Sequence, residues 1–337
     1  MATIPLRRWA LLLALAGACT TAFARPYSDL YVFGDSLTDS GNVFYFTTQF
    51  LPIAPDIPAP PYFQGRFSNG YNFADDLSLG LFGKPTAASR TGGNNFAVGG
   101  ATTGRSNVVA PVLPGLRAQA EDFLSTRAST GADPNALYLV YGGSNDLIAA
   151  TDDVGSGDPT LIAQDTVNAA MANLGAIITE LSASGAQHFL VPNLADIGKL
   201  PRFLGAGELS TFASQASTSF NAALATLLQT FPTLDIHTLD VHAAFDAARA
   251  GLGGFGDTTT ACYTGGIEGG TPPVPCADPD NHLFWDDIHP TARTHAILGD
   301  LAYAAAVPEP RVWMVLLAGI LLTCVGARRA RALQTRA

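Results

Sequence analysis

Residues 29–42 read DLYVFGDSLTDSGN, and this stretch decides the fold. The run Asp29–Phe33 is short, apolar and rich in aromatic and β-branched residues, which predicts a buried strand. Glycine, serine, aspartate and asparagine follow it at once and indicate a turn. Because parallel α/β sheets bind ligands beyond the carboxyl ends of their strands, we expect a functional site at this turn.

The rest of the chain repeats this strand pattern and alternates it with helical patterns. Three further runs have the composition of strands, namely Ala136–Tyr141, His188–Val191 and Leu234–Asp240. Three other runs carry apolar residues at helical spacing, namely Thr166–Ser184, Thr211–Thr230 and Thr291–Ala306. Such alternation predicts a parallel sheet with helices on both faces. No repeat or long linker interrupts it, so we expect one domain over residues 25–307.

The composition excludes several classes of protein. Of the 337 residues, 47% are hydrophobic and 14% are charged, which is unlike a disordered chain. The formal net charge is −10, yet residues 1–24 and 311–337 contain cations and no acid. The remaining eleven cations and twenty-eight acids give the body a charge of −17. We therefore expect no nucleic-acid partner, because the body repels phosphate backbones.

The first 24 residues have the parts of a secretory signal peptide. Arg7 and Arg8 precede the apolar run Trp9–Ala18, and Ala22-Phe23-Ala24 has the form of a signal peptidase site. We expect cleavage after Ala24 and export across the inner membrane. A retained N-terminal anchor is the alternative, and a lipoprotein attached at Cys19 fits the pattern less well.

The C-terminal end has a second three-part pattern. Pro308, Glu309 and Pro310 precede the apolar run Val312–Gly326, and an arginine cluster follows. Fifteen helical residues span about 22 Å, which is short of the ~30 Å hydrocarbon core. The layout resembles the PEP-CTERM sorting signal of Gram-negative bacteria. That resemblance implies a transient membrane segment over 308–337, removed by an exosortase, and a mature protein at the cell surface or outside the cell. A C-terminal core helix is the alternative.

Two of the four cysteines fall in the exported body. Cys19 and Cys324 lie in the terminal segments, which leaves Cys262 and Cys276. An even pair in an oxidising compartment predicts a disulfide. A catalytic thiol or a pair of metal ligands is the alternative.

Polar groups follow the strands in several places, and together they suit acyl transfer. A serine such as Ser36 becomes a nucleophile when an imidazole accepts its proton, and the imidazole needs an acid that orients it. Asp286 and His289 are close enough in sequence for one turn to join them. An oxyanion requires backbone N–H groups and an amide, which Gly100 and Asn145 could supply.

These residues have simpler interpretations when each is taken alone. Ser36 could cap the next helix, and Asn145 could form an Asx turn. Asp39 and Asn42 are expected to order the turn after Ser36, and Asp196 to brace a loop at the pocket rim. The sequence contains no cluster of metal ligands, so we expect no metal and no cofactor.

Taken together, Gly34-Asp35-Ser36-Leu37 and the later segments resemble the GDSL lipase/esterase family, also called SGNH hydrolases. The segment Gly65–Gly70, GRFSNG, is similar to the secreted, plant-lipase-like branch. The resemblance implies an α/β/α three-layer, flavodoxin-like SGNH hydrolase fold with a mostly parallel sheet. It implies these roles: nucleophile Ser36, base His289, orienting acid Asp286, and an oxyanion hole from Ser36, Gly100 and Asn145. Gly99 directly precedes Gly100. The oxyanion role is assigned to Gly100 by alignment of the Ala-Thr-Thr that follows it.

The predicted function is that of an exported serine ester hydrolase that cleaves carboxylic esters through an acyl-enzyme intermediate. Its expected partners are a small-molecule or lipid ester and the processing enzymes named above. Two alternatives remain: an acyltransferase that uses the same triad, and a non-catalytic surface or matrix protein. The sequence makes no prediction of the oligomeric state.

Overall fold

A four-stranded parallel sheet forms the centre of the molecule. The computed structural model describes residues 26–50, 56–268 and 274–307. The strands run in the spatial order β1-β2-β3-β4, with bounds β1 Leu30–Phe33, β2 Leu137–Val140, β3 His188–Pro192 and β4 Asp235–Leu239. All three pairings are parallel. The four predicted strands are therefore confirmed, each within one or two residues at its ends.

A fifth segment completes the flavodoxin-like order at the free edge of β1. Asn95 forms a parallel bridge with Val32, and the Phe96 N–H donates to the Val32 carbonyl at 2.7 Å. This segment comes second in sequence but lies outside the first strand. Counting it as a strand gives the order 2-1-3-4-5 of flavodoxin-like sheets. Because this segment lies beside β1, the chain after residue 96 emerges next to the turn that follows β1.

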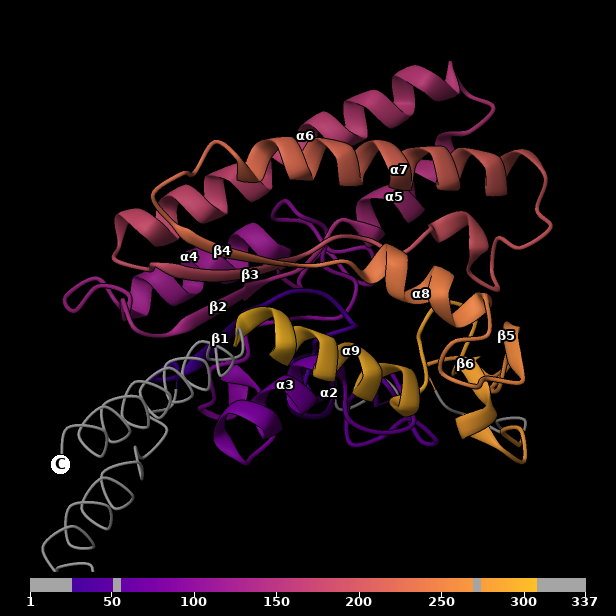
Figure 1. The fold of residues 1–337 in the computed structure, drawn as a ribbon, viewed down its shortest axis with the longest axis horizontal. Coiled ribbons are helices and arrows are strands. Elements are labelled where there is room, and N and C mark those ends of the chain that lie inside the picture. Colours follow the sequence, from indigo (N-terminus) through magenta and orange to yellow (C-terminus); the bar gives the residue numbers. More distant parts are fainter. Residues whose placement is uncertain (1–25, 51–55, 269–273, 308–337) are drawn as a thin grey trace, which may run out of the picture.

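Helices cover both faces of the sheet and complete the three predicted layers (Figure 1). One face carries α4 Leu116–Thr126, α6 Pro159–Ala183 and α7 Glu208–Leu228. The other carries α3 Phe73–Phe82 and α9 Ala292–Ala306, which pack against each other. Shorter helices connect the layers: α2 Asn42–Phe50, α5 Ser144–Ala150 and α8 Val241–Arg249. Single 3₁₀ turns are η1 Ser89–Thr91, η2 Thr151–Asp153, η3 Ile197–Lys199 and η4 Pro279–Asn281.

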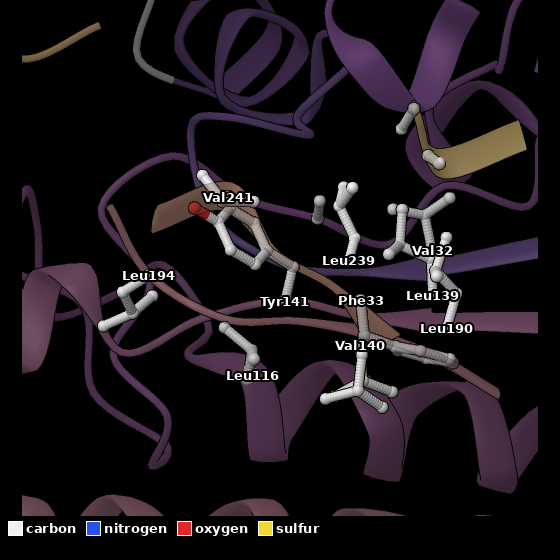
Figure 2. Close-up of a cluster of buried hydrophobic side chains, with 14 of the residues drawn as sticks. Val32, Phe33, Leu116, Leu139, Val140, Tyr141, Leu190, Leu194, Leu239 and Val241 are labelled. Carbon is white, nitrogen blue, oxygen red and sulfur yellow. The ribbon is translucent and has the colours of Figure 1, made fainter. Parts of the chain in front are cut away.

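The core lies on both faces of the strands. Val32, Leu139 and Leu190 are aligned by the strand register and form a row on one face. Phe33 and Val140 alternate with them and point to the opposite face, as Figure 2 shows. All five side chains are fully buried. Each contributes roughly 1.5–3 kcal/mol by burial, and this apolar core fixes where the polar turns emerge.

Helix boundaries depart from prediction where capping residues set them. The helix expected from Thr166 begins seven residues earlier, because Asp158 accepts the Thr160 N–H at 2.8 Å and Pro159 occupies the first turn. It ends at Ala183, before Gly185 at a φ of 124°. The helix predicted from Thr291 is confirmed, with Thr291 as its N-cap.

A second, two-stranded sheet was not predicted. It pairs β5 Asp257–Ala261 with β6 His282–Phe284. The predicted disulfide is present there: Cys262 and Cys276 are joined with an S–S distance of 2.00 Å. The chain after β6 leads directly into the turn that carries Asp286 and His289.

The predicted signal peptide and C-terminal sorting segment lie outside the described residues, and so does the Pro308-Glu309-Pro310 motif. Within residues 26–50, 56–268 and 274–307, no helix is both long enough and apolar enough to cross a membrane.

Candidate active site

Three side chains from opposite ends of the chain form a hydrogen-bonded series. Ser36 lies in the turn after β1, and its Oγ is 2.8 Å from Nε2 of His289. The other ring nitrogen, Nδ1, is 2.7 Å from Oδ2 of Asp286. Asp286 and His289 are both buried. This is the arrangement in which an imidazole can accept a proton from a hydroxyl.

The turn that carries Ser36 is fixed from both sides. The Gln119 side chain binds both backbone groups of Gly34, at 2.9 Å each. A Cβ on Gly34 would lie 2.1 Å from Oγ1 of Thr38, so the turn requires glycine. The carboxylate of Asp39 accepts the N–H groups of Gly41, just before α2, and of Asn42 and Val43, its first two residues, at 2.6–3.2 Å. Asp39 therefore caps that helix, and Ser36 instead faces the histidine.

The two carboxylates beside this turn are protonated more readily than ordinary aspartates. Burial raises the pKa of Asp35 to about 7, and Oδ2 of that residue has no hydrogen-bond partner among the described residues. Burial also raises the pKa of Asp39 to about 6, although four backbone N–H groups that donate to this carboxylate act in the opposite direction. Near neutral pH the negative charge close to Ser36 is therefore partly suppressed.

The acid of the series is held ionised. Burial acts to raise the pKa of Asp286, but the charge of His289 and the hydrogen bonds it receives outweigh that effect, and the pKa is lowered. Its Oδ1 accepts the N–H groups of Ile288 at 2.9 Å and His289 at 2.6 Å. The neighbouring Asp287 points away and pairs with Arg202, with Nε and Oδ2 2.7 Å apart.

The segment GRFSNG supports the histidine turn. The Phe67 ring lies against the His289 imidazole, with 5.3 Å between centroids. The Ser68 hydroxyl donates to the Pro290 carbonyl at 2.8 Å, and Asn69 Oδ1 accepts the Ala292 N–H at 2.7 Å. These contacts hold the residues on either side of the turn, which gives this segment a structural role beside the site.

Ser36, Gly100 and Asn145, the residues predicted to supply oxyanion donors, line one cavity. Asn145 lies at the start of α5, and one of its amide hydrogens is donated to the Ala101 carbonyl at 3.0 Å. The Gly99 N–H already donates to Asp39 Oδ2 at 2.9 Å. Across the described ranges, no acceptor is recorded for the N–H of Ser36 or of Gly100. This difference favours Gly100 over Gly99 as a donor.

The loop that carries Gly100 is closely constrained. Gly100 has a φ of 78°, and a Cβ there would lie 2.5 Å from Cγ2 of Val109. Asp146, beside Asn145, accepts both the N–H and the hydroxyl of Thr103, at 2.9 and 2.7 Å. Helix α5 thus holds the loop at two adjacent residues. Sequence reasoning missed Asp146, although its place in the Ser-Asn-Asp segment was a usable signal.

These groups open into a cavity of about 550 Å³. Ser36, His289, Gly100 and Asn145 line it, together with several apolar side chains: Phe67, Val108, Val109, Ile148, Ile267 and Ile288. Asp196, expected to brace a loop at the pocket rim, caps η3 and accepts the Ser214 hydroxyl. In the part of the chain that the structure describes, no group of His, Cys, Asp or Glu is arranged to hold a metal ion.

The side-chain amide of Asn145 gives a testable prediction. We expect Asn145→Ala to lower kcat for ester substrates by about 10²–10³-fold with little change in KM, because an oxyanion donor acts mainly in the transition state. Steady-state kinetics on a chromogenic ester measures this. An effect confined to KM would assign Asn145 to ground-state substrate binding instead.

Comparison with known proteins matches residues 30–302 to a family described as GDSL-like lipase/acylhydrolase. An uncharacterized protein in the trpE-trpG intergenic region of Pseudomonas putida is 32% identical, over 90% of this chain and 53% of that protein. Esterase EstA of Pseudomonas aeruginosa is 29% identical, over 88% of this chain and 49% of that protein. The chain thus spans about half the length of these two relatives.

A third relative is matched over nearly the whole of its own length. It is a phosphatidylcholine-sterol acyltransferase of Aeromonas hydrophila, 26% identical over 88% of this chain and 96% of that protein. Residues 30–302 include every candidate site residue from Ser36 to His289.

Proposed function

The chain belongs to the GDSL-like lipase/acylhydrolase family, and we propose that it is a serine ester hydrolase that acts through an acyl-enzyme at Ser36. One observation carries this proposal. The series Ser36–His289–Asp286, with distances of 2.8 and 2.7 Å, lies in the same cavity as the uncommitted donors of Gly100 and Asn145. Nucleophile, base, orienting acid and oxyanion donors are the groups that acyl transfer requires.

In the first half of the reaction, Ser36 Oγ attacks the ester carbonyl carbon while His289 Nε2 takes the hydroxyl proton. The carbonyl oxygen becomes an oxyanion, which the N–H groups of Ser36 and Gly100 and the Asn145 amide stabilise. The tetrahedral intermediate collapses, the C–O bond to the alcohol breaks, and His289 returns its proton to the departing alcohol. Ser36 is left as an acyl ester.

In the second half, water takes the place of the alcohol. His289 removes a proton from the water as it attacks the acyl carbon, and the same donors hold the second oxyanion. Collapse releases the carboxylic acid, and the proton on His289 returns to Ser36 Oγ. Asp286 stays ionised throughout and stabilises the imidazolium that forms twice in each cycle.

The lining of the cavity favours neutral, apolar esters. Its walls are mainly aliphatic and aromatic, and among the described residues that line it Arg202 is the only lysine or arginine. That guanidinium is already paired with Asp287 through two hydrogen bonds of 2.7 and 3.2 Å. A substrate carboxylate or phosphate would therefore meet no uncommitted positive charge among the residues that line the cavity.

An acyltransferase is the second candidate, because the relative named for that activity matches over nearly its full length. In that case an alcohol attacks the acyl-enzyme in place of water, and every other step is unchanged. A non-catalytic surface protein has less support, since it would have no need of the bonded series or of the uncommitted donors.

The proposal is tested by combining p-nitrophenyl ester turnover with a serine-directed fluorophosphonate. We expect turnover, and one covalent adduct per chain that maps to the peptide containing Ser36. Added glycerol separates the two candidates: a hydrolase releases mainly free acid, and a transferase releases mainly acylglycerol. Absence of both turnover and adduct would leave only the non-catalytic alternative.

We further propose that the protein belongs to the secreted, plant-lipase-like branch and is exported. The GRFSNG segment and the signal-peptide pattern with Ala22-Phe23-Ala24 support this. Cleavage after Ala24 leaves the hydrolase domain 25–307, and an exosortase-type enzyme removes the membrane segment near Pro308–Pro310. The mature enzyme then remains at the cell surface or outside the cell. The intact mass of the exported protein, from a host with an exosortase, reports both cleavages.

A further inference from the structure

A tyrosine from a distant part of the chain contacts the acid of the series. The Tyr62 hydroxyl lies 2.7 Å from Oδ2 of Asp286, although 224 residues separate the two. This is the same oxygen that lies 2.7 Å from Nδ1 of His289. With the two backbone N–H groups at Oδ1, the carboxylate therefore accepts four hydrogen bonds, two at each oxygen.

The Tyr62 hydroxyl can act only as a donor in this contact. Burial, followed by the charge of Asp286 and the hydrogen bond to it, raises the pKa of Tyr62 far above its ordinary value. The pKa of Asp286 is lowered, so that carboxyl is ionised and accepts. The bond is thus charge-assisted, which makes it stronger than a bond between neutral groups.

The ring of Tyr62 is fixed by an aromatic cluster. It packs edge-on against Tyr263 at 5.6 Å and against Trp285 at 6.1 Å, measured between ring centroids. Tyr263 and Trp285 are themselves stacked at 5.4 Å. Cys262 belongs to the same buried cluster, so the disulfide holds the segment on which Tyr62 rests.

Backbone bonds join this cluster to the acid–histidine turn. The Tyr263 N–H donates to the Trp285 carbonyl at 2.7 Å, and the Trp285 N–H donates to the His289 carbonyl at 2.8 Å. The hydroxyl therefore meets Asp286 from a rigid support and not from a mobile loop.

We propose that Tyr62 is a positioning residue for the reaction proposed above, whose hydroxyl holds Asp286 Oδ2 in line with Nδ1 of His289 and moderates the basicity of the carboxylate. The inference rests on that reaction. Without the hydroxyl, Oδ2 keeps a single partner, Nδ1 of His289, in a buried site, and its contact with the imidazole is less closely fixed. The carboxylate also becomes more basic and stabilises the imidazolium more strongly, so activity should require a higher pH.

Other titratable groups also face this pair, and they remain in place when only the hydroxyl is removed. They come from the turn after β1, the disulfide-bonded segment, the acid–histidine turn itself, α9 and the loop after η3: Asp35, Tyr263, Asp287, His295 and Arg202. The pH profile of a Tyr62→Phe variant therefore reports the loss of one donor against a constant background.

The test is the pH dependence of kcat and kcat/KM for the wild type and Tyr62→Phe on one p-nitrophenyl ester. We expect kcat to fall about tenfold with KM little changed, because the phenyl ring still lines the cavity. The acid limb of kcat/KM should move about half a unit to higher pH. A variant with both the wild-type kcat and the wild-type acid limb would overturn the proposal and leave Tyr62 a packing residue.

The matched control is Tyr138→Phe. Tyr138 is buried, as Tyr62 is, and its hydroxyl donates to the Asp133 carbonyl at 2.9 Å, away from the site. This variant should lose a comparable amount of stability and keep the wild-type pH profile. If wild type itself shows neither turnover nor a fluorophosphonate adduct, the proposed function fails. If wild type is active and Tyr62→Phe matches it, only the positioning role fails.

A second variant covers the case in which Tyr62→Phe does not fold. Incorporating 3-fluorotyrosine at position 62 keeps the ring and makes the hydroxyl a stronger donor. The acid limb should then move to lower pH, opposite to the shift expected on removing the donor. An unchanged limb in this folded variant contradicts the proposal.

Discussion

Ser36→Ala is expected to lower kcat for ester hydrolysis by about 10⁴–10⁶-fold, which is the largest effect we predict. The methyl group cannot form the acyl-enzyme, and it leaves His289 Nε2 without the hydroxyl now 2.8 Å away. The oxyanion donors remain, so a small residual rate above that in water should persist. The fold loss in kcat is measured from turnover of a p-nitrophenyl ester. A fluorophosphonate is added first to remove any contaminating esterase activity.

The expected loss should occur without loss of the fold. Ser36 Oγ contacts the site histidine, whereas Gln119 and Asp39 hold the turn through backbone groups. Thermal unfolding of Ser36→Ala should therefore stay close to that of wild type. The control is Ser28→Ala, which removes a serine hydroxyl bonded to Asp133 at the surface and should leave turnover unchanged. Normal turnover in a folded Ser36→Ala protein would refute the acyl-enzyme mechanism.

The sequence predicted strands β1 and β2 well because both are fully buried. Leu30–Phe33 and Leu137–Val140 are apolar at every position, and burial on both faces leaves no polar alternation to confuse the pattern. The short helices were harder to predict. Helix α5 has seven residues, and its first residues serve the site, so local sequence preference gives a weak signal there.

The contacts that support the site could not be read from local patterns. Tyr62 reaches Asp286 across 224 residues, and Ser68 reaches Pro290 across 222. The sequence around Tyr62 or Ser68 gives no sign of which distant residue each will contact. The sequence thus identified the reactive residues, because their residue types and the order of their motifs along the chain indicate the chemistry. The structure adds the residues that hold them, whose types are common and whose partners are set by tertiary packing.

Asp286→Asn is expected to lower kcat by about 10²–10⁴-fold. Each carboxylate oxygen now accepts two hydrogen bonds, and an asparagine side chain can offer only one accepting oxygen. The N–H groups of Ile288 and His289 are fixed by the turn, so the amide oxygen must face them. The amide NH₂ then faces Nδ1 of His289 and makes it an acceptor. The ring proton moves to Nε2, which then points at Ser36 as a donor and cannot take the hydroxyl proton.

This argument predicts a sharp contrast between adjacent aspartates. Asp287 is half-exposed and bonds Arg202, so Asp287→Asn removes a surface ion pair that contributes about 0–1 kcal/mol and should reduce kcat less than about tenfold. Asp286→Asn should also lose activity at every pH, since a wrong tautomer is not restored by raising the pH. Parallel pH profiles of the two variants and wild type measure both effects. A greater loss in Asp287→Asn than in Asp286→Asn would show that the histidine is oriented by the other carboxylate, contrary to the 2.7 Å contact between Asp286 and Nδ1.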